Sequence, residues 1–161
     1  MSLGPRAVLA VLGVTFARDG NRFYATLGTR GQTYLIEGDL ERRAARVVRA
    51  GVECPALSPD NTRVAFKKRT GGVVTGVSWR LSVLELGTGM EWELAERRSV
   101  DDQVEWLDDR QILYGLLTAS AGTVVINIWT VPGDGSGEPQ LLVPGAASPV
   151  VIRAGHRAGE R

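Results

Sequence analysis

Five acidic side chains gather in one short stretch and form the densest group of potential catalytic or metal-binding residues. They are Asp101, Asp102, Glu105, Asp108 and Asp109. Carboxylate oxygens are the ligands that calcium prefers, and carboxylates also act as general acids and bases. One hypothesis is therefore a divalent-cation site, calcium above all, with Asp101, Asp102, Asp108 and Asp109 as candidate ligands. The alternative is that these residues belong to solvated turns on either side of Trp106, and that the protein uses no cofactor.

The rest of the sequence offers little for covalent or zinc chemistry. The only histidine, His156, lies in the polar segment RAGHRAGER, and no Gly-x-Ser-x-Gly motif occurs. The single cysteine, Cys54, excludes an internal disulfide and is interpreted as a small buried hydrophobe rather than a reactive thiol. The run Asp134–Glu138 resembles part of a calcium-binding loop but lacks carboxylates at the ends, so it predicts a hairpin turn. We therefore predict no catalytic residues.

Charge and hydropathy exclude two classes of partner. The 19 basic and 18 acidic residues give a net charge of +1, which provides no electrostatic case for nucleic acid or an anionic membrane. The basic run Lys67–Arg69 is expected on a solvated face. The apolar run Arg6–Val14 is far shorter than the ~20 residues that span a membrane, so it predicts a buried strand.

A short pattern recurs three times along the chain. A large apolar residue, here called the anchor, is followed three residues later by an aspartate and then by a run rich in β-branched or aromatic residues. The anchors are Phe16, Leu57 and Trp106, spaced 41 and 49 residues apart. The turn residues after them suit a chain reversal, because aspartate bonds its own backbone, proline fixes φ, and glycine or asparagine tolerates positive φ. They are Asp19, Gly20, Pro59, Asp60, Asn61 and Asp109. Arg110 departs from the pattern, which predicts a different turn type there.

Two further strand-like runs follow each of these turns. In the second repeat they are WRLSVLEL at 79–86 and EWELAE at 91–96, separated by Gly87-Thr88-Gly89. The stretch DLERRAARVVRA at 39–50 fits a helix as well, but its place in the repeat favours a strand. Each period therefore holds four short strands, and four antiparallel strands in roughly 40–45 residues is the signature of a β-propeller blade.

The corner Leu57-Ser58-Pro59-Asp60-Asn61 resembles the Ser-Pro-Asp-Gly blade motif of TolB-like, WD-repeat-like β-propellers. That motif also occurs in the propeller domains of prolyl-oligopeptidase-type peptidases. The resemblance covers residues ~14 to 150 and implies an extracytoplasmic bacterial protein that serves as a scaffold or binds other proteins. The segment Thr70–Ser78 lengthens the second repeat, and loops of this kind often carry a propeller's function.

The sequence thus predicts an all-β fold of about three blades, an incomplete or half ring. The expected segments are an N-terminal strand or lead-in at 1–13, blades at 14–51, 52–99 and 100–145, a closing strand or start of a further blade at 146–153, and a disordered tail at 154–161. Since a closed propeller takes about four to eight blades, two copies forming a six-blade homodimer is one way to complete the ring.

Three functions remain open at this stage. The first is a non-enzymatic module that binds a protein or peptide. The second is a catalytic propeller, a hydrolase or lyase, that uses the carboxylates or a divalent cation at its channel mouth. The third is a structural fragment of a larger propeller.

Overall fold

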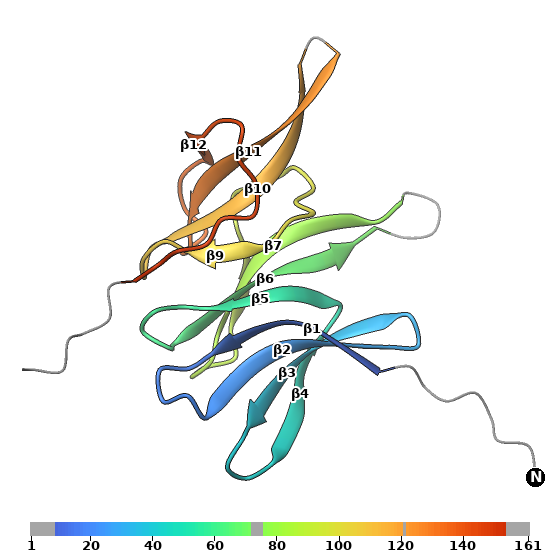
Figure 1. The fold of residues 1–161 in the computed structure, drawn as a ribbon, viewed down its shortest axis with the longest axis vertical. Helices are drawn as coiled ribbons and strands as arrows, with labels where there is room; N and C mark the ends of the chain where they lie inside the picture. The colour runs from blue at the N-terminus through green and yellow to red at the C-terminus, as the bar shows by residue number, and fades with distance from the viewer. Residues whose placement is uncertain (1–8, 72–75, 121, 154–161) are drawn as a thin grey trace, which may run out of the picture.

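Twelve antiparallel strands make up the computed structural model, which describes residues 9–71, 76–120 and 122–153 (Figure 1). They form three four-stranded sheets, named here blade 1, blade 2 and blade 3. Blade 1 contains β1 (Leu9–Phe16), β2 (Arg22–Thr29), β3 (Gln32–Asp39) and β4 (Ala44–Ala50). Blade 2 contains β5 (Val52–Leu57), β6 (Arg63–Thr70), β7 (Ser78–Glu85) and β8 (Glu91–Glu93). Blade 3 contains β9 (Val104–Trp106), β10 (Gln111–Ser120), β11 (Thr123–Pro132) and β12 (Gln140–Val143).

Each blade is a meander in which consecutive strands pair. The first strands β1, β5 and β9 lie next to one another, and the sheets fan out from them (Figure 1). The predicted all-β fold of three four-stranded blades is confirmed, and the stretch that also fits a helix forms β4. None of the described residues forms a helix that is long and apolar enough to cross a membrane.

The repeated turns connect the first and second strands of each blade. Gly20 and Asn61 adopt positive φ values of 69° and 61°, as the turn chemistry requires. The anchors Phe16 and Leu57 pair with residues seven positions later, Phe23 and Val64.

The third turn is one residue shorter than the sequence pattern suggests. The anchor Trp106 pairs with Ile112, only six residues on, so Ile112 rather than Leu113 is the equivalent of Val64. The reason is that Asp108, not Asp109, closes this turn, by accepting hydrogen bonds from the backbone N–H groups of Arg110 and Gln111 at 2.7 and 2.8 Å.

The first strands of blades 1 and 2 share a bulge three residues before the anchor. Gly13 and Cys54 occupy this position with φ values of 59° and 53°, and the ladder shifts register there. Cys54 is only partly buried, so the interpretation as a buried hydrophobe holds in part, and burial raises the pKa of its thiol.

Two apolar layers join the blades. Between blades 1 and 2, Tyr24 and Leu35 pack against the anchor face of blade 2, whose buried residues are Leu57, Val64, Phe66 and Leu84. Between blades 2 and 3, a second layer brings Ala56, Ala65, Leu81 and Val83 against Trp106, Ile112 and Tyr114. In both layers the face that carries the anchor packs on the preceding blade. Trp92 and Trp129 border the second layer.

The anchor face of blade 1 lies open. Val11, Val14 and Phe16 are all more than half exposed, although β1 pairs with β2 along its length. The prediction of a strand at Arg6–Val14 is confirmed from Leu9 onward, but the prediction that it is buried is wrong. The physical reason is that no described part of the chain packs on this side of blade 1.

The segment 146–153 follows β12 and returns past β10 and β9, red in Figure 1. Asp102 holds it, accepting hydrogen bonds from the Ser148 backbone N–H at 2.8 Å and hydroxyl at 3.0 Å. Gly115 makes room for this carboxylate, since a Cβ there would lie 1.9 Å from Asp102 Oδ2. Arg153 adds an ion pair with Glu105 at 3.5 Å.

A buried carboxylate, Glu96, lies in the segment that connects blades 2 and 3 and anchors that segment to Tyr114 of blade 3. Its oxygens accept hydrogen bonds from the Arg98 guanidinium, at 2.6 and 2.8 Å, and from the Tyr114 hydroxyl. Burial opposes ionisation, but Arg98 and Tyr114 together hold the pKa of Glu96 below its ordinary value. Burial and the adjacent carboxylate raise the pKa of Tyr114, so its hydroxyl stays protonated and donates.

We predict that Glu96→Gln lowers the free energy of unfolding by about 2 kcal/mol near neutral pH, because hydrogen bonds to a charged group are lost. The folded-state pKa of Glu96 lies below that of the unfolded chain. The wild-type advantage is therefore complete above the unfolded pKa and disappears as the pH falls through the folded one. Urea unfolding of both proteins across this acid range measures the difference.

The matched control is Glu93→Gln, which removes an exposed carboxylate that pairs with Arg97 at 2.8 Å. Exposed pairs contribute about 0–1 kcal/mol, so this variant should unfold close to the wild type. Equal losses in the two variants would contradict a special role for Glu96.

Candidate functional site

The structure divides the acidic candidates between the two ends of β9. Before the strand, Asp101 accepts a hydrogen bond from Lys67 Nζ at 2.6 Å, and Asp102 holds Ser148. Lys67 is buried, with its ammonium 4.6 Å from the centre of the Trp79 ring and 3.7 Å from Glu53. The prediction that this basic run lies wholly on a solvated face is therefore wrong for Lys67, because acidic neighbours compensate for its desolvation.

After the strand, Asp108 closes its own turn and Asp109 reaches the turn of blade 2. Asp109 Oδ1 accepts a hydrogen bond from the Asp60 backbone N–H at 2.8 Å. Within the described ranges, no three His, Cys, Asp or Glu side chains lie close enough together to hold a metal ion. His156 lies outside the described residues, as do positions 72–75 of the long second-repeat loop.

The repeated turns are linked from blade to blade. Asp109 of blade 3 accepts a hydrogen bond from the Asp60 backbone N–H of blade 2. Asn61 Oδ1 of blade 2 accepts one from the Arg18 backbone N–H of blade 1 at 3.2 Å. Asp60 also caps its own turn, with hydrogen bonds from Ser58 and Thr62 at 2.6 to 3.0 Å. These hydrogen bonds join the turns of the three blades into one continuous rim. Asp19 closes the turn of blade 1 by accepting from the N–H groups of Asn21 and Arg22 at 2.9 and 3.0 Å.

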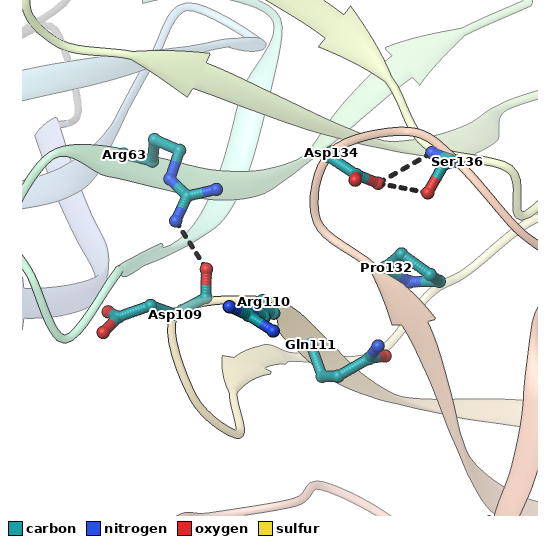
Figure 2. Close-up of a pocket in the computed structure, with 7 residues that line it drawn as sticks. All are labelled: Arg63, Asp109, Arg110, Gln111, Pro132, Asp134 and Ser136. Carbon is teal, nitrogen blue, oxygen red and sulfur yellow. Dashed lines mark hydrogen bonds between the residues drawn. The ribbon is translucent and has the colours of Figure 1, made fainter.

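A cleft of about 550 Å³ opens on this rim between blades 2 and 3 (Figure 2). Three parts of the chain contribute to it: the start of β6, the turn between β9 and β10, and the turn between β11 and β12. Its lining residues are Arg63, Asp109, Arg110, Gln111, Pro132, Asp134 and Ser136. Because the first and third turns of each meander lie on the same side of the blades, residues far apart in the sequence meet here.

Arg63 joins the two blades at the floor of the cleft. Its guanidinium donates to the Asp109 carbonyl oxygen (Figure 2), lies 3.6 Å from the Asp60 carboxylate, and covers the Trp106 ring at 5.0 Å. Desolvation opposes ionisation of Asp60, but hydrogen bonds from Ser58 and Thr62 and the charge of Arg63 keep its pKa below the usual value. The Arg63 guanidinium therefore holds the turns of blades 2 and 3 together.

Arg110 and Asp134 are the charged groups that remain available to a ligand. Within the described residues, the Arg110 guanidinium makes no hydrogen bond or ion pair, and only its backbone is engaged. Asp134 lies across the cleft in Figure 2, where the hydroxyl and backbone N–H of Ser136 lower the pKa of its carboxyl. The Gln111 side-chain oxygen accepts from Thr130 at 3.0 Å, which leaves its amide nitrogen for a ligand.

The cleft offers a ligand a cation, a carboxylate and an amide in a space open to solvent. The Ser136 hydroxyl donates to the Asp134 carboxylate. Sequence reasoning found Asp60 and Asp109 as turn residues but missed Arg63, Arg110 and Gln111. The available signal was their place directly after the repeated turn, on the rim that all turns share.

Comparison with known proteins identifies the fold. No protein-family model matches the chain, and no curated protein matches it in sequence. Among solved structures, acylaminoacyl peptidase from Pyrococcus horikoshii aligns with a TM-score of 0.66 and 13% identity over 84% of this chain and 25% of that one. A Mycobacterium tuberculosis puromycin-hydrolyzing peptidase aligns with a TM-score of 0.60 and 17% identity over 84% of this chain and 24% of that one.

The β-propeller domain of the Trilobed protease from Pyrococcus furiosus aligns with a TM-score of 0.59 and 16% identity, over 86% of this chain and 42% of that one. The chain thus has the β-propeller fold, and it spans about a quarter of the length of the peptidases that it resembles. At these identities the likeness shows the fold and not a particular propeller family, so the TolB-like resemblance stays an expectation.

We predict that Gly133→Ala destabilises the protein by about 1–3 kcal/mol through overpacking. A Cβ at this position would lie 2.7 and 2.9 Å from Trp106 ring carbons and 3.3 Å from the Arg110 carbonyl oxygen. Trp106 cannot yield, because it is fully buried and donates to the Ala56 carbonyl oxygen at 2.9 Å. Gly87→Ala is the control, since a Cβ there meets nothing within 4 Å. Denaturant unfolding compares the two variants, and equal stability would argue against tight packing beneath the cleft.

Proposed function

We propose that the chain is a non-catalytic β-propeller module that binds a peptide or protein segment in the cleft between blades 2 and 3. The observation that carries the proposal is the Arg110 guanidinium, which lines the cleft without an ionic partner among the described residues. A guanidinium recognises a carboxylate through paired, charge-assisted hydrogen bonds. The ligand is therefore a peptide that presents a carboxylate, either its C-terminus or an acidic side chain.

The other lining groups suit the polar backbone of such a ligand. Asp134 offers a carboxylate oxygen to peptide N–H groups, and the Gln111 amide nitrogen can donate to a carbonyl. Hydrogen bonds from Arg63 and Asp60 to Asp109 hold the floor of the cleft in place. The protein therefore loses little conformational entropy when a ligand binds. Several proteins of similar fold are named as peptidases, which supports a peptide as the ligand class. The extracytoplasmic location implied by the TolB-like resemblance belongs to the same proposal.

A second candidate is a structural part of a larger propeller. It is favoured by the coverage of the similar structures. The alignment with this chain covers only 42% of the Trilobed protease propeller domain and about a quarter of the acylaminoacyl peptidase. In that case the cleft is one of several sites around a complete ring, and its ligand is shared with the neighbouring blades.

A display library of random peptides with free carboxyl termini is the test of peptide binding. We expect wild-type protein to enrich peptides that Arg110→Ala binds about tenfold more weakly, since a charge-assisted hydrogen bond contributes about 1.5–3 kcal/mol. Fluorescence anisotropy with one labelled, enriched peptide measures the difference. Where its C-terminus is the recognised group, amidation should weaken wild-type binding and leave Arg110→Ala unaffected.

Arg97→Ala is the matched control, because Arg97 is an exposed arginine that does not line the cleft. It should bind like the wild type. A library that enriches nothing, or a peptide whose affinity is the same for Arg110→Ala as for the wild type, would contradict the proposed site.

A further inference from the structure

The anchor face of blade 1 exposes several large apolar side chains to solvent. The apolar residues on this face, paired across four strands, are Val11, Val14, Phe16, Phe23, Ala25, Leu27, Ile36 and Val47. Those of β1, together with Val47, are more than half exposed, whereas Ala25 and Ile36 are buried. Phe16 and Phe23 pack on each other with ring centroids 5.9 Å apart. Exposed apolar patches of this extent mark interaction sites on soluble proteins.

The repeat itself shows what belongs on this face. The anchors of blades 2 and 3, Leu57 and Trp106, are 7% and 0% exposed because each packs against the preceding blade. Phe16 occupies the same position in blade 1 and is 53% exposed. The same kind of interface therefore forms twice within the chain, between blades 1 and 2 and between blades 2 and 3. The anchor face of blade 1 is equivalent to one side of this interface but has no described partner.

The complementary half lies on the far side of blade 3. The face of β10 and β11 that points away from blade 2 carries Leu117, Val124 and Ile126, all of them exposed. Beside them runs the segment 146–153, held by Asp102, with Val150 and Ile152 almost fully exposed. On the same face Leu113 and Ile128, which correspond in strand register to Ala65 and Leu81 of blade 2, are already buried. A partner would therefore contact the outer part of β10 and β11 together with the segment 146–153.

We propose that the open anchor face of blade 1 binds blade 3 of a second copy of this chain. A two-fold axis lets each copy supply both halves, so two equal contacts form and no apolar face is left over. Two chains of three blades make a ring of about six, within the range of closed propellers. This interface is separate from the cleft and does not depend on peptide binding.

Light scattering on a sizing column tests the pairing. We expect wild-type protein to have twice the 17.3 kDa mass of the chain. Phe16→Glu, on one face, and Leu117→Lys, on the other, should each shift the mass to that of a single chain. The control is Leu40→Glu, since Leu40 is 52% exposed in the turn between β3 and β4 and lies on neither face.

Mixing the two interface variants gives a sharper result. A mixed pair keeps one unaltered contact, because both substitutions fall in the same one of its two interfaces. The mixture should therefore recover part of the double mass that neither variant shows alone. Wild-type protein with the mass of one chain, a mass that keeps rising with concentration, or a Phe16→Glu protein that still pairs would each overturn the proposal. Circular dichroism establishes that the variants remain folded.

Discussion

The structure depends on one kind of contact, the packing of the anchor faces of blades 2 and 3 on the blade that precedes each of them. A single four-stranded sheet of this size cannot bury enough apolar surface to be stable alone, so blade 2 is stabilised by the neighbours on its two faces. The strongest element is Trp106, which is fully buried, bonds the Ala56 carbonyl oxygen of blade 2, and lies beneath Arg63. The same residue thus serves the core and the floor of the cleft.

Much of the fold could be predicted from the sequence because repetition reports on structure. The anchors Phe16, Leu57 and Trp106, each followed by a turn, indicated four strands per period. The burial of β1 could not be predicted, because burial depends on a neighbouring blade and not on the hydropathy of the strand. Arg110 predicted a different type for the third turn, but not that this turn is one residue shorter. Asp108 and Asp109 are equally able to close it, and only the strand register distinguishes them.

The acidic run shows why a local cluster is poor evidence for a site. Its members are neighbours in sequence, but each is engaged by a different partner, which is Lys67 for Asp101, Ser148 for Asp102 and the Asp60 backbone for Asp109. Lys67 and Asp60 precede the aspartates that they contact by 34 and 49 residues, and Ser148 follows Asp102 by 46. No local pattern encodes such distances. The sequence therefore supplies the residue types, whereas the partner of each side chain depends on the fold.

The rim and the blade faces are mechanically connected although they form separate surfaces. Along the rim, the Asp60 N–H donates to Asp109 Oδ1 and the Arg18 N–H donates to Asn61 Oδ1. These two hydrogen bonds hold the turns of all three blades in place relative to one another. The anchor residues lie directly before these turns, and two of them, Leu57 and Trp106, pack between the blades. A contact that covers the anchor face of blade 1 would therefore restrain Phe16 and the turn beside it.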